Sequence, residues 1–280
     1  MKREYNFTNN ISETTNCDIY ISDENNSKNQ PLVILVHGFR AFKDWGFFPY
    51  MASEIAKAGF IVCSIDFSLN TLSDREKCIF DMDRFRTNTV TQEISEINQF
   101  IDLIMQGCVL NKDEENKWNK EIYLIGHSLG GGLAIAAASK TPYVKKLVTI
   151  NSIFDFDIYT DKQKEKWFSM GYKEFLDSNT NQMIKLDLKF LEDRLTYNNE
   201  RSILSMVSKL NIPYLILHSE NDVTVSPRAA NNLFEASNKD YSKKVILSKA
   251  NHTLGVSHPF TASNDSLDNA IHIIIDFLTE

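Results

Sequence analysis

The 280-residue sequence has only 10 glycines and 4 cysteines, and it lacks long apolar runs. Its longest apolar runs, such as residues 32–36, are far too short to cross a bilayer. The cysteines are scattered and form no C-x-x-C pair, which favours free thiols. The first ten residues carry charge with no apolar stretch behind it, so we expect no signal peptide and a cytoplasmic protein.

An excess of positive charge is also absent. The formal net charge is −7 and no run of Lys or Arg occurs, which argues against a general nucleic-acid surface. Hydrophobic residues make up 42% of the chain and charged residues 24%, as in folded proteins that bury a large core. The sequence carries no signal for an oligomeric state.

Short apolar runs recur along the chain, separated by longer amphipathic segments. The clearest are residues 32–36, 60–65, 122–125, 147–150, 214–217 and 245–247. Runs this short and apolar on both faces are typical of buried parallel strands, whereas residues 5–8 and 17–22 alternate and suit an antiparallel edge. Helices are predicted over residues 49–58, 89–105, 129–140 and 266–278. This order predicts a single α/β domain over residues 1–280, with an eight-stranded, mostly parallel sheet and helices on both faces.

Residues 152–211 interrupt this alternation. They contain no clear strand and are too long for an ordinary connection between a strand and a helix. The segment is highly charged yet rich in large apolar side chains, so we interpret it as a small cap inserted into the domain. Its aromatic residues Trp167 and Phe175 are candidates for lining a substrate pocket, because ligand pockets are mostly apolar.

The most informative motif is Gly126-His127-Ser128-Leu129-Gly130, which fits G-x-S-x-G. A strand that turns directly into a helix holds the central residue in a strained conformation, and the flanking glycines avoid side-chain collisions there. The hydroxyl of Ser128 would then project above the sheet as a nucleophile. We expect the side chain of His127 to point away from it, in a packing or hydrogen-bonding role.

A serine nucleophile needs a base and an acid to orient that base. Asp222 follows the run at 214–217, and His252 follows the run at 245–247, so both fall at the carboxyl edge where open α/β sheets carry their sites. Glu220 is a rival to Asp222, and His258 is a rival to His252. We favour Asp222 and His252, the latter because it lies nearer the end of its strand.

The same chemistry needs backbone donors for the oxyanion of the tetrahedral intermediate. One is expected from the N–H of Leu129, directly after the serine. The other is expected from the loop after residues 32–36, where Gly38 permits close approach and the N–H of Phe39 is our choice.

Taken together, HGF after the third strand, GHSLG after the fifth, and the later acid and histidine resemble the α/β-hydrolase superfamily. The stretches HGFRAFKDW and ANHTLGVSHPF are similar to serine-aminopeptidase-like and dienelactone-hydrolase-like carboxylesterases. The resemblance implies a Ser128–Asp222–His252 triad acting on small esters without metal or organic cofactor.

Three alternatives remain at this point. A thioesterase or a peptidase would use the same triad. A non-catalytic protein of the same fold would bind a ligand while Ser128 stays unreactive. A metal cluster of His218, His252, His258 and Asp222 is disfavoured, because their spacing matches no compact metal motif.

Overall fold

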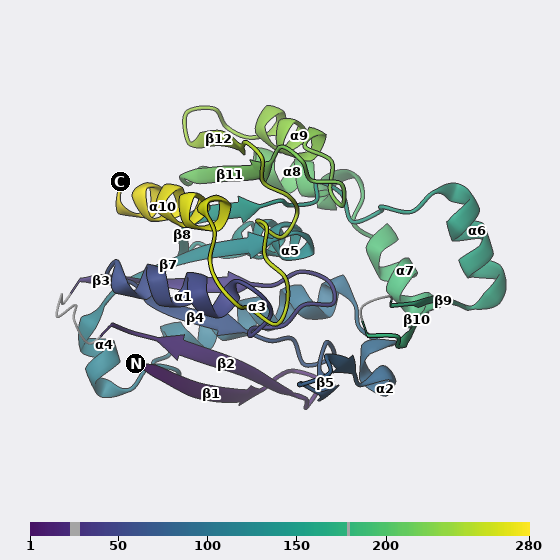
Figure 1. Ribbon diagram of the computed structural model, residues 1–280, viewed down its shortest axis with the longest axis horizontal. Coiled ribbons are helices and arrows are strands. Elements are labelled where there is room, and N and C mark those ends of the chain that lie inside the picture. Colours follow the sequence, from purple (N-terminus) through teal and green to yellow (C-terminus); the bar gives the residue numbers. More distant parts are fainter. Residues whose placement is uncertain (23–28, 178–179) are drawn as a thin grey trace.

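The computed structural model describes residues 1–22, 29–177 and 180–280. An eight-stranded sheet forms its centre, in the order β1-β2-β4-β3-β7-β8-β11-β12 (Figure 1). The strands span Lys2–Thr8 (β1), Thr14–Tyr20 (β2), Gln30–Val36 (β3), Ile61–Ile65 (β4), Trp118–His127 (β7), Val144–Ile150 (β8), Tyr214–Ser219 (β11) and Ser242–Leu247 (β12). Strand β2 pairs antiparallel with both β1 and β4, and the remaining pairs are parallel. The predicted fold class is confirmed, including the antiparallel edge.

The central strands are apolar on both faces because helices cover both faces. In β3, Ile34 packs into one core with α3 (Val90–Met105), α5 (Leu129–Ala138), α8 (Ile203–Ser208) and α9 (Arg228–Ala236). Its neighbour Leu35 packs into a second core with α1 (Phe48–Lys57) and α10 (Asp265–Thr279). The two layers are visible in Figure 1, where α1 and α10 lie in front of the sheet. The four predicted helices agree with α1, α3, α5 and α10.

The segment between β8 and β11 folds into α6 (Asp161–Met170), β9 (Tyr172–Leu176), β10 (Met183–Asp187), α7 (Leu188–Leu195), the 3-10 turn η1 (Asn199–Arg201) and α8. The prediction that this segment contains no strand is wrong, because β9 and β10 form an antiparallel hairpin. These two strands are only partly buried and pair with each other, so they lack the apolar runs that marked the central strands.

Elements α6, β9, β10 and α7 group at one end of the molecule (Figure 1). Trp167, Ile184 and Phe190 pack there against Phe80 and Phe85 in a third apolar cluster. The latter two residues come from β6 (Ile79–Phe80), which pairs with β5 (Leu72–Asp74), and from α2 (Met82–Phe85). Helix α4 (Lys112–Lys117) precedes β7.

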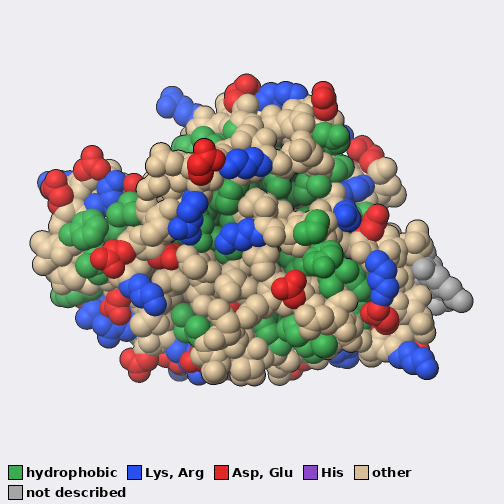
Figure 2. All heavy atoms as spheres, turned by 180° about the vertical axis from the view of Figure 1, so that it is seen from behind, with side chains coloured by type: hydrophobic (Ala, Val, Ile, Leu, Met, Phe, Trp, Pro, Cys, Tyr) green, Lys and Arg blue, Asp and Glu red, His purple; other side chains and the backbone are tan. Residues whose placement is uncertain are grey.

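The surface carries charges of both signs. On the face seen from behind in Figure 2, acidic and basic side chains are intermixed among the residues drawn in colour. Within the described ranges, no helix combines the length and the apolar character that a membrane crossing requires. All four cysteines are free thiols.

Candidate functional site

The serine of the G-x-S-x-G motif lies at the turn between β7 and α5. Ser128 has φ 57° and ψ −120°, a conformation that costs about 1–3 kcal/mol for a residue with a side chain. Its backbone N–H donates to the carbonyl of Ile150 at 2.9 Å, which ties the turn to the end of β8. The Ser128 hydroxyl makes no helix-capping hydrogen bond, so it remains available to other partners.

The glycines of the motif are required by close backbone approach. A Cβ added at Gly126 would lie 2.2 Å from the carbonyl oxygen of Gly130. One added at Gly130 would lie 2.3 Å from the carbonyl oxygen of Val36, at the end of β3. The helix therefore begins in contact with two strand ends, and the loop after β3 is brought beside Ser128.

Ser128, His252 and Asp222 form one continuous chain of hydrogen bonds. The Nε2 of His252 lies 3.1 Å from the Oγ of Ser128, and its Nδ1 lies 2.7 Å from the Oδ2 of Asp222. Asp222 follows β11 and His252 follows β12, which are parallel neighbours with carboxyl ends at one edge. The three predicted side chains therefore meet at that edge.

The environment of Asp222 favours its ionised form. Burial by itself would raise the pKa of this carboxyl, but hydrogen bonds from His252 and from the N–H groups of Val225 and Thr224 lower it below its ordinary value. A permanent negative charge at Oδ2 fixes the proton of His252 on Nδ1 and leaves Nε2 as an acceptor toward the serine.

The rival acid and the rival histidine lie elsewhere. Glu220 is exposed, and its carboxylate accepts from the N–H of Lys249 at 3.3 Å. His258 accepts from the N–H of Gly46 at 2.9 Å and stacks on Trp45 with ring centroids 6.1 Å apart. Both side chains thus have local partners, and His258 joins the loop after β12 to the start of α1.

Two buried side chains hold the backbone of the histidine loop. Asn151, directly after β8, donates from Nδ2 to the carbonyl of His252 at 2.9 Å, and its Oδ1 accepts from the N–H of Ser219 at 2.7 Å. The Nε2 of His127 lies 2.8 Å from the same His252 carbonyl, in agreement with the hydrogen-bonding role expected for it. Burial, with a smaller contribution from His252, lowers the pKa of His127 to about 3, so it is a neutral donor. The role of Asn151 was missed, although a polar residue following the run at 147–150 marks the same sheet edge.

We expect Asn151→Ala to lower the free energy of unfolding by about 1–3 kcal/mol, because it leaves buried groups of two loops without partners. Urea denaturation measures the change. Asn269→Ala, at an exposed position of α10, is the control and should shift stability by less than about 0.5 kcal/mol. Equal stability of the two variants would contradict the bridging role of Asn151.

The two backbone amides predicted as oxyanion donors lie close to the serine. A Cβ on Gly38 would lie 3.0 Å from the Ser128 Cβ and 3.6 Å from the N of Leu129, so these loops are in contact. In the described part of the chain, the N–H groups of Phe39 and Leu129 donate to no protein acceptor. Leu129 also begins α5, whose positive dipole end faces the serine.

The two aromatic candidates in the segment between β8 and β11 differ in exposure. Trp167 is 1% exposed and packs against Tyr159 and Phe190. Phe175 is partly exposed and lies beneath the guanidinium of Arg40 at 5.6 Å. Arg40 itself follows Phe39 and pairs with Asp177 at 2.6 Å, so an ion pair joins the segment between β8 and β11 to the loop beside Ser128.

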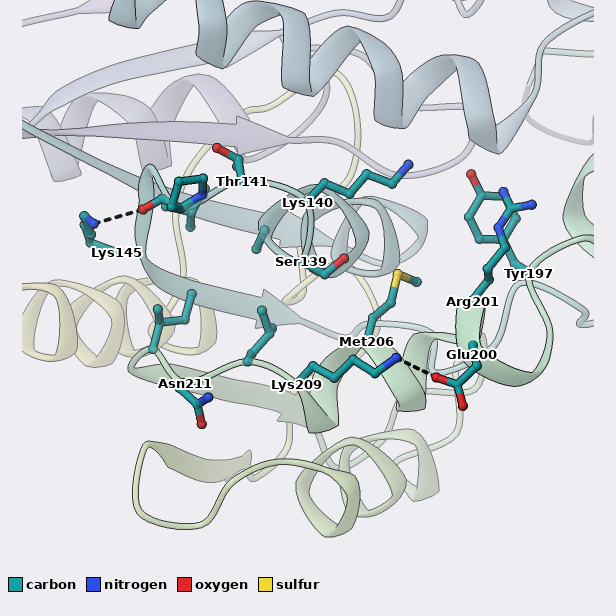
Figure 3. Close-up of a pocket in the computed structure, with 15 residues that line it drawn as sticks. Ser139, Lys140, Thr141, Lys145, Tyr197, Glu200, Arg201, Met206, Lys209 and Asn211 are labelled. Atoms are coloured by element: carbon teal, nitrogen blue, oxygen red, sulfur yellow. Dashed lines mark hydrogen bonds and ion pairs between the residues drawn. The ribbon is translucent and has the colours of Figure 1, made fainter.

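A cavity of about 460 Å³ lies away from this edge, at the opposite end of α5 (Figure 3). Its lining includes Lys140, Tyr197, Arg201 and Lys209, and Figure 3 shows Lys140 pointing toward Tyr197 and Arg201. Glu200 pairs there with Lys209 at 2.6 Å. The cavity begins at Ala138, the last residue of α5, whereas Ser128 precedes the first residue of this helix, so the cavity is no part of the hydrogen-bonded chain. Among the described residues, no group of three or more His, Cys, Asp or Glu side chains is arranged to hold a metal ion.

A buried acid on α3 makes stability depend on pH. Glu93 is 4% exposed and accepts from Asn88 at 2.7 Å, and burial raises its pKa to about 8. In the unfolded chain the same carboxyl titrates near its ordinary value of 4.5. Between these two values the unfolded state releases the proton and the folded state keeps it, so stability falls as pH rises from about 5 to 8.

We therefore expect Glu93→Gln, which cannot ionise, to remove this loss. The variant should match the wild type near pH 4.5 and exceed its unfolding free energy at pH 8 by about 2–4 kcal/mol. Urea denaturation at both pH values measures the difference, with Glu165→Gln at an exposed site of α6 as the control. Parallel pH profiles for the wild type and Glu93→Gln would show that Glu93 is not the group responsible.

The fold and the strand-end site define a class, and the sequence supports it independently. Residues 31–199 match the family model described as alpha/beta hydrolase fold, so the chain belongs to the α/β-hydrolase family. No curated protein sequence gives a significant match. The protein is a hydrolase of this fold.

Several solved structures have the same fold. An esterase domain from Rhodothermus marinus is 18% identical, with a TM-score of 0.64 and coverage of 99% of this chain and 97% of that one. Est1E from Butyrivibrio proteoclasticus with bound ferulic acid is 17% identical, with a TM-score of 0.71 and coverage of 96% and 95%. A monoacylglycerol lipase from Paleococcus ferrophilus is 16% identical, with a TM-score of 0.65 and coverage of 89% and 95%. At these identities the likeness concerns the fold.

Proposed function

We propose that the protein is a serine hydrolase that cleaves small carboxylic esters through an acyl-enzyme intermediate. The observation that carries the proposal is the continuous chain from Ser128 Oγ through His252 to Asp222, with contacts of 3.1 Å and 2.7 Å. A nucleophile, a base and an acid in this geometry are the minimum that acyl transfer by serine requires.

In the proposed reaction Ser128 attacks the ester carbonyl while His252 takes its proton at Nε2. Asp222, held ionised, stabilises the imidazolium and keeps its Nδ1 protonated. The N–H groups of Phe39 and Leu129 bind the oxyanion, and His252 then protonates the departing alkoxide. Water then attacks the acyl-enzyme while His252 takes its proton, and His252 returns that proton to the oxygen of Ser128 as the acid is released.

Further support for an ester substrate comes from solved structures of the same fold. The relatives of the same fold include an esterase domain, a monoacylglycerol lipase and a protein with bound ferulic acid.

Residues 152–211 are proposed to act as a cap, because the Arg40–Asp177 ion pair and the contact between Phe39 and Phe190 join this segment to the site. Thioester and peptide substrates would use the same catalytic groups. Comparing the turnover of esters, thioesters and amides decides among the three substrate classes.

The proposal is tested with a fluorophosphonate probe and a panel of substrates. We expect the probe to modify Ser128, identified by peptide mass spectrometry, and p-nitrophenyl esters to turn over faster than acyl-CoA thioesters or aminoacyl amides. No labelling of the folded protein would favour the non-catalytic ligand-binding alternative. Labelling combined with faster thioester or amide turnover would correct the substrate class and retain the triad.

A further inference from the structure

A group of four side chains in the cap carries two cations beside buried donors. We call Tyr159, Trp167, Lys173 and Arg194 the cationic cluster. Arg194, on α7, is 3% exposed and donates from Nη1 to the carbonyl of Phe156 at 3.0 Å. Within the described ranges, its Nε has no hydrogen-bond partner and its guanidinium forms no ion pair. A buried guanidinium stays charged, so leaving it without a counter-charge is costly.

The second cation lies against the same aromatic rings. The Nζ of Lys173 lies 4.3 Å from the ring centroid of Tyr159 and 5.4 Å from that of Trp167. Burial, together with the nearby charge of Arg194, lowers the pKa of Lys173. Among the residues that the structure describes, the indole Nε1 of Trp167 is a further buried donor without a partner. The cluster thus gathers donors and like charges, and it lacks the negative charge that would balance them.

The carboxyl groups close to the cluster do not balance its positive charge, because they interact with other partners or stay protonated. Asp157 pairs with a lysine of α6 at 2.7 Å, and Asp193 accepts from a backbone amide of α3 at 2.9 Å. Glu93 interacts with Arg194 without forming an ion pair, and its raised pKa leaves it mostly protonated at neutral pH. None of these three carboxyls therefore neutralises Arg194 and Lys173 together.

A row of aromatic rings joins the cluster to the proposed active site. The guanidinium carbon of Arg194 lies 4.6 Å from the ring centroid of Phe190, on which Trp167 stacks at 6.0 Å. The other neighbour of Phe190 is Phe39, with ring centroids 5.7 Å apart. Phe39 supplies one of the proposed oxyanion donors, so the cluster lies one ring beyond the residue that borders Ser128.

We propose that the cationic cluster binds a carboxylate at the end of the substrate remote from the scissile ester. The proposal rests on the proposed function and names the substrate class, which is an ester of an acid or alcohol that carries a second, ionised carboxyl group. The planar fork of Arg194 matches a carboxylate, Lys173 adds a point charge, and the indole N–H supplies one more donor. Aromatic rings lie between the cluster and Ser128, so a substrate that reaches both would contact apolar side chains along its hydrocarbon or aromatic part.

The test compares matched substrates with and without the charge. One pair is the p-nitrophenyl monoester of suberic acid and the same ester with a terminal carboxamide. A second pair carries the carboxylate or the carboxamide on the aryl leaving group of an acetate ester. We expect the wild type to prefer the carboxylate in one pair by about tenfold to a hundredfold in kcat/KM, the effect of a charged hydrogen bond. A ratio at or below one in both pairs would overturn the proposal.

Variants then assign the preference to the cluster. Arg194→Met and Lys173→Met should each reduce the ratio by about tenfold, whereas Lys185→Met, on β10 over the ring of Tyr172, should leave it unchanged. Labelling by a neutral fluorophosphonate reports that each variant is folded. If Arg194→Met is unfolded, the test is made with Lys173→Met, because the Lys173 side chain is partly exposed and its replacement disturbs packing less. An unchanged ratio in labelled variants would also overturn the proposal. Failure of the wild type to be labelled or to hydrolyse the neutral esters would instead defeat the proposed function.

Discussion

Ser128→Ala is expected to reduce ester turnover by about three to six orders of magnitude and to abolish fluorophosphonate labelling. The variant keeps the turn between β7 and α5 but removes the only atom of the hydrogen-bonded chain that can attack a carbonyl. Residual rate above water would come from oxyanion donors and substrate positioning. Initial rates with p-nitrophenyl acetate and gel-based labelling measure both effects.

The control for this variant is Ser139→Ala at the far end of α5. The hydroxyl of Ser139 donates to the carbonyl of Ala136 and lies on the solvent side. We expect its turnover to remain within about twofold of the wild type, because surface changes away from a site have small effects. Turnover by Ser128→Ala at the rate of Ser139→Ala would require another nucleophile.

His252→Ala is expected to have a similarly large effect, again about three to six orders of magnitude in kcat/KM. Without the imidazole, the proton of Ser128 has no acceptor, and Asp222 is left as a buried charge without its partner. The loss should be much smaller for His258→Ala, which we expect to keep most of the activity. The two histidines lie six positions apart on the same loop, so the pair tests the assignment directly.

The reason for the difference is the surroundings of His258. Its ring accepts from Gly46 and stacks on Trp45, so its removal affects the packing between the loop and α1. Thermal unfolding separates the two effects, because His258→Ala should lower the melting temperature while it keeps most of the ester turnover. Loss of activity in His258→Ala with retention in His252→Ala would overturn the assignment of the base.

Much of this architecture is encoded locally. The runs at 32–36 and 122–125 are apolar on both faces because helices cover both sides of the sheet, and their residues alternate between two cores. The G-x-S-x-G turn is likewise local. Its glycines are needed because a side chain there would collide with backbone atoms a few residues away or at the adjacent strand end. Parallel strands place their carboxyl ends at one edge, so the order of serine, acid and histidine predicted which loops would meet, whereas the structure separates Asp222 and His252 from Glu220 and His258.

Features that depend on contacts distant in sequence were not predictable in the same way. The hairpin of β9 and β10 is stabilised by pairing with itself and by packing on residues about one hundred positions earlier, such as Phe80 and Phe85. Asn151 and His127 take their roles from the carbonyl of His252, which lies 101 and 125 positions later in the chain. Among the residues that the structure describes, Arg194 forms no ion pair, and this depends on how α6, α7 and β9 pack in the folded chain. Periodicity and motif spacing therefore yield the sheet and the nucleophile, whereas counter-charges and loop anchors depend on which distant segments the folded chain brings into contact.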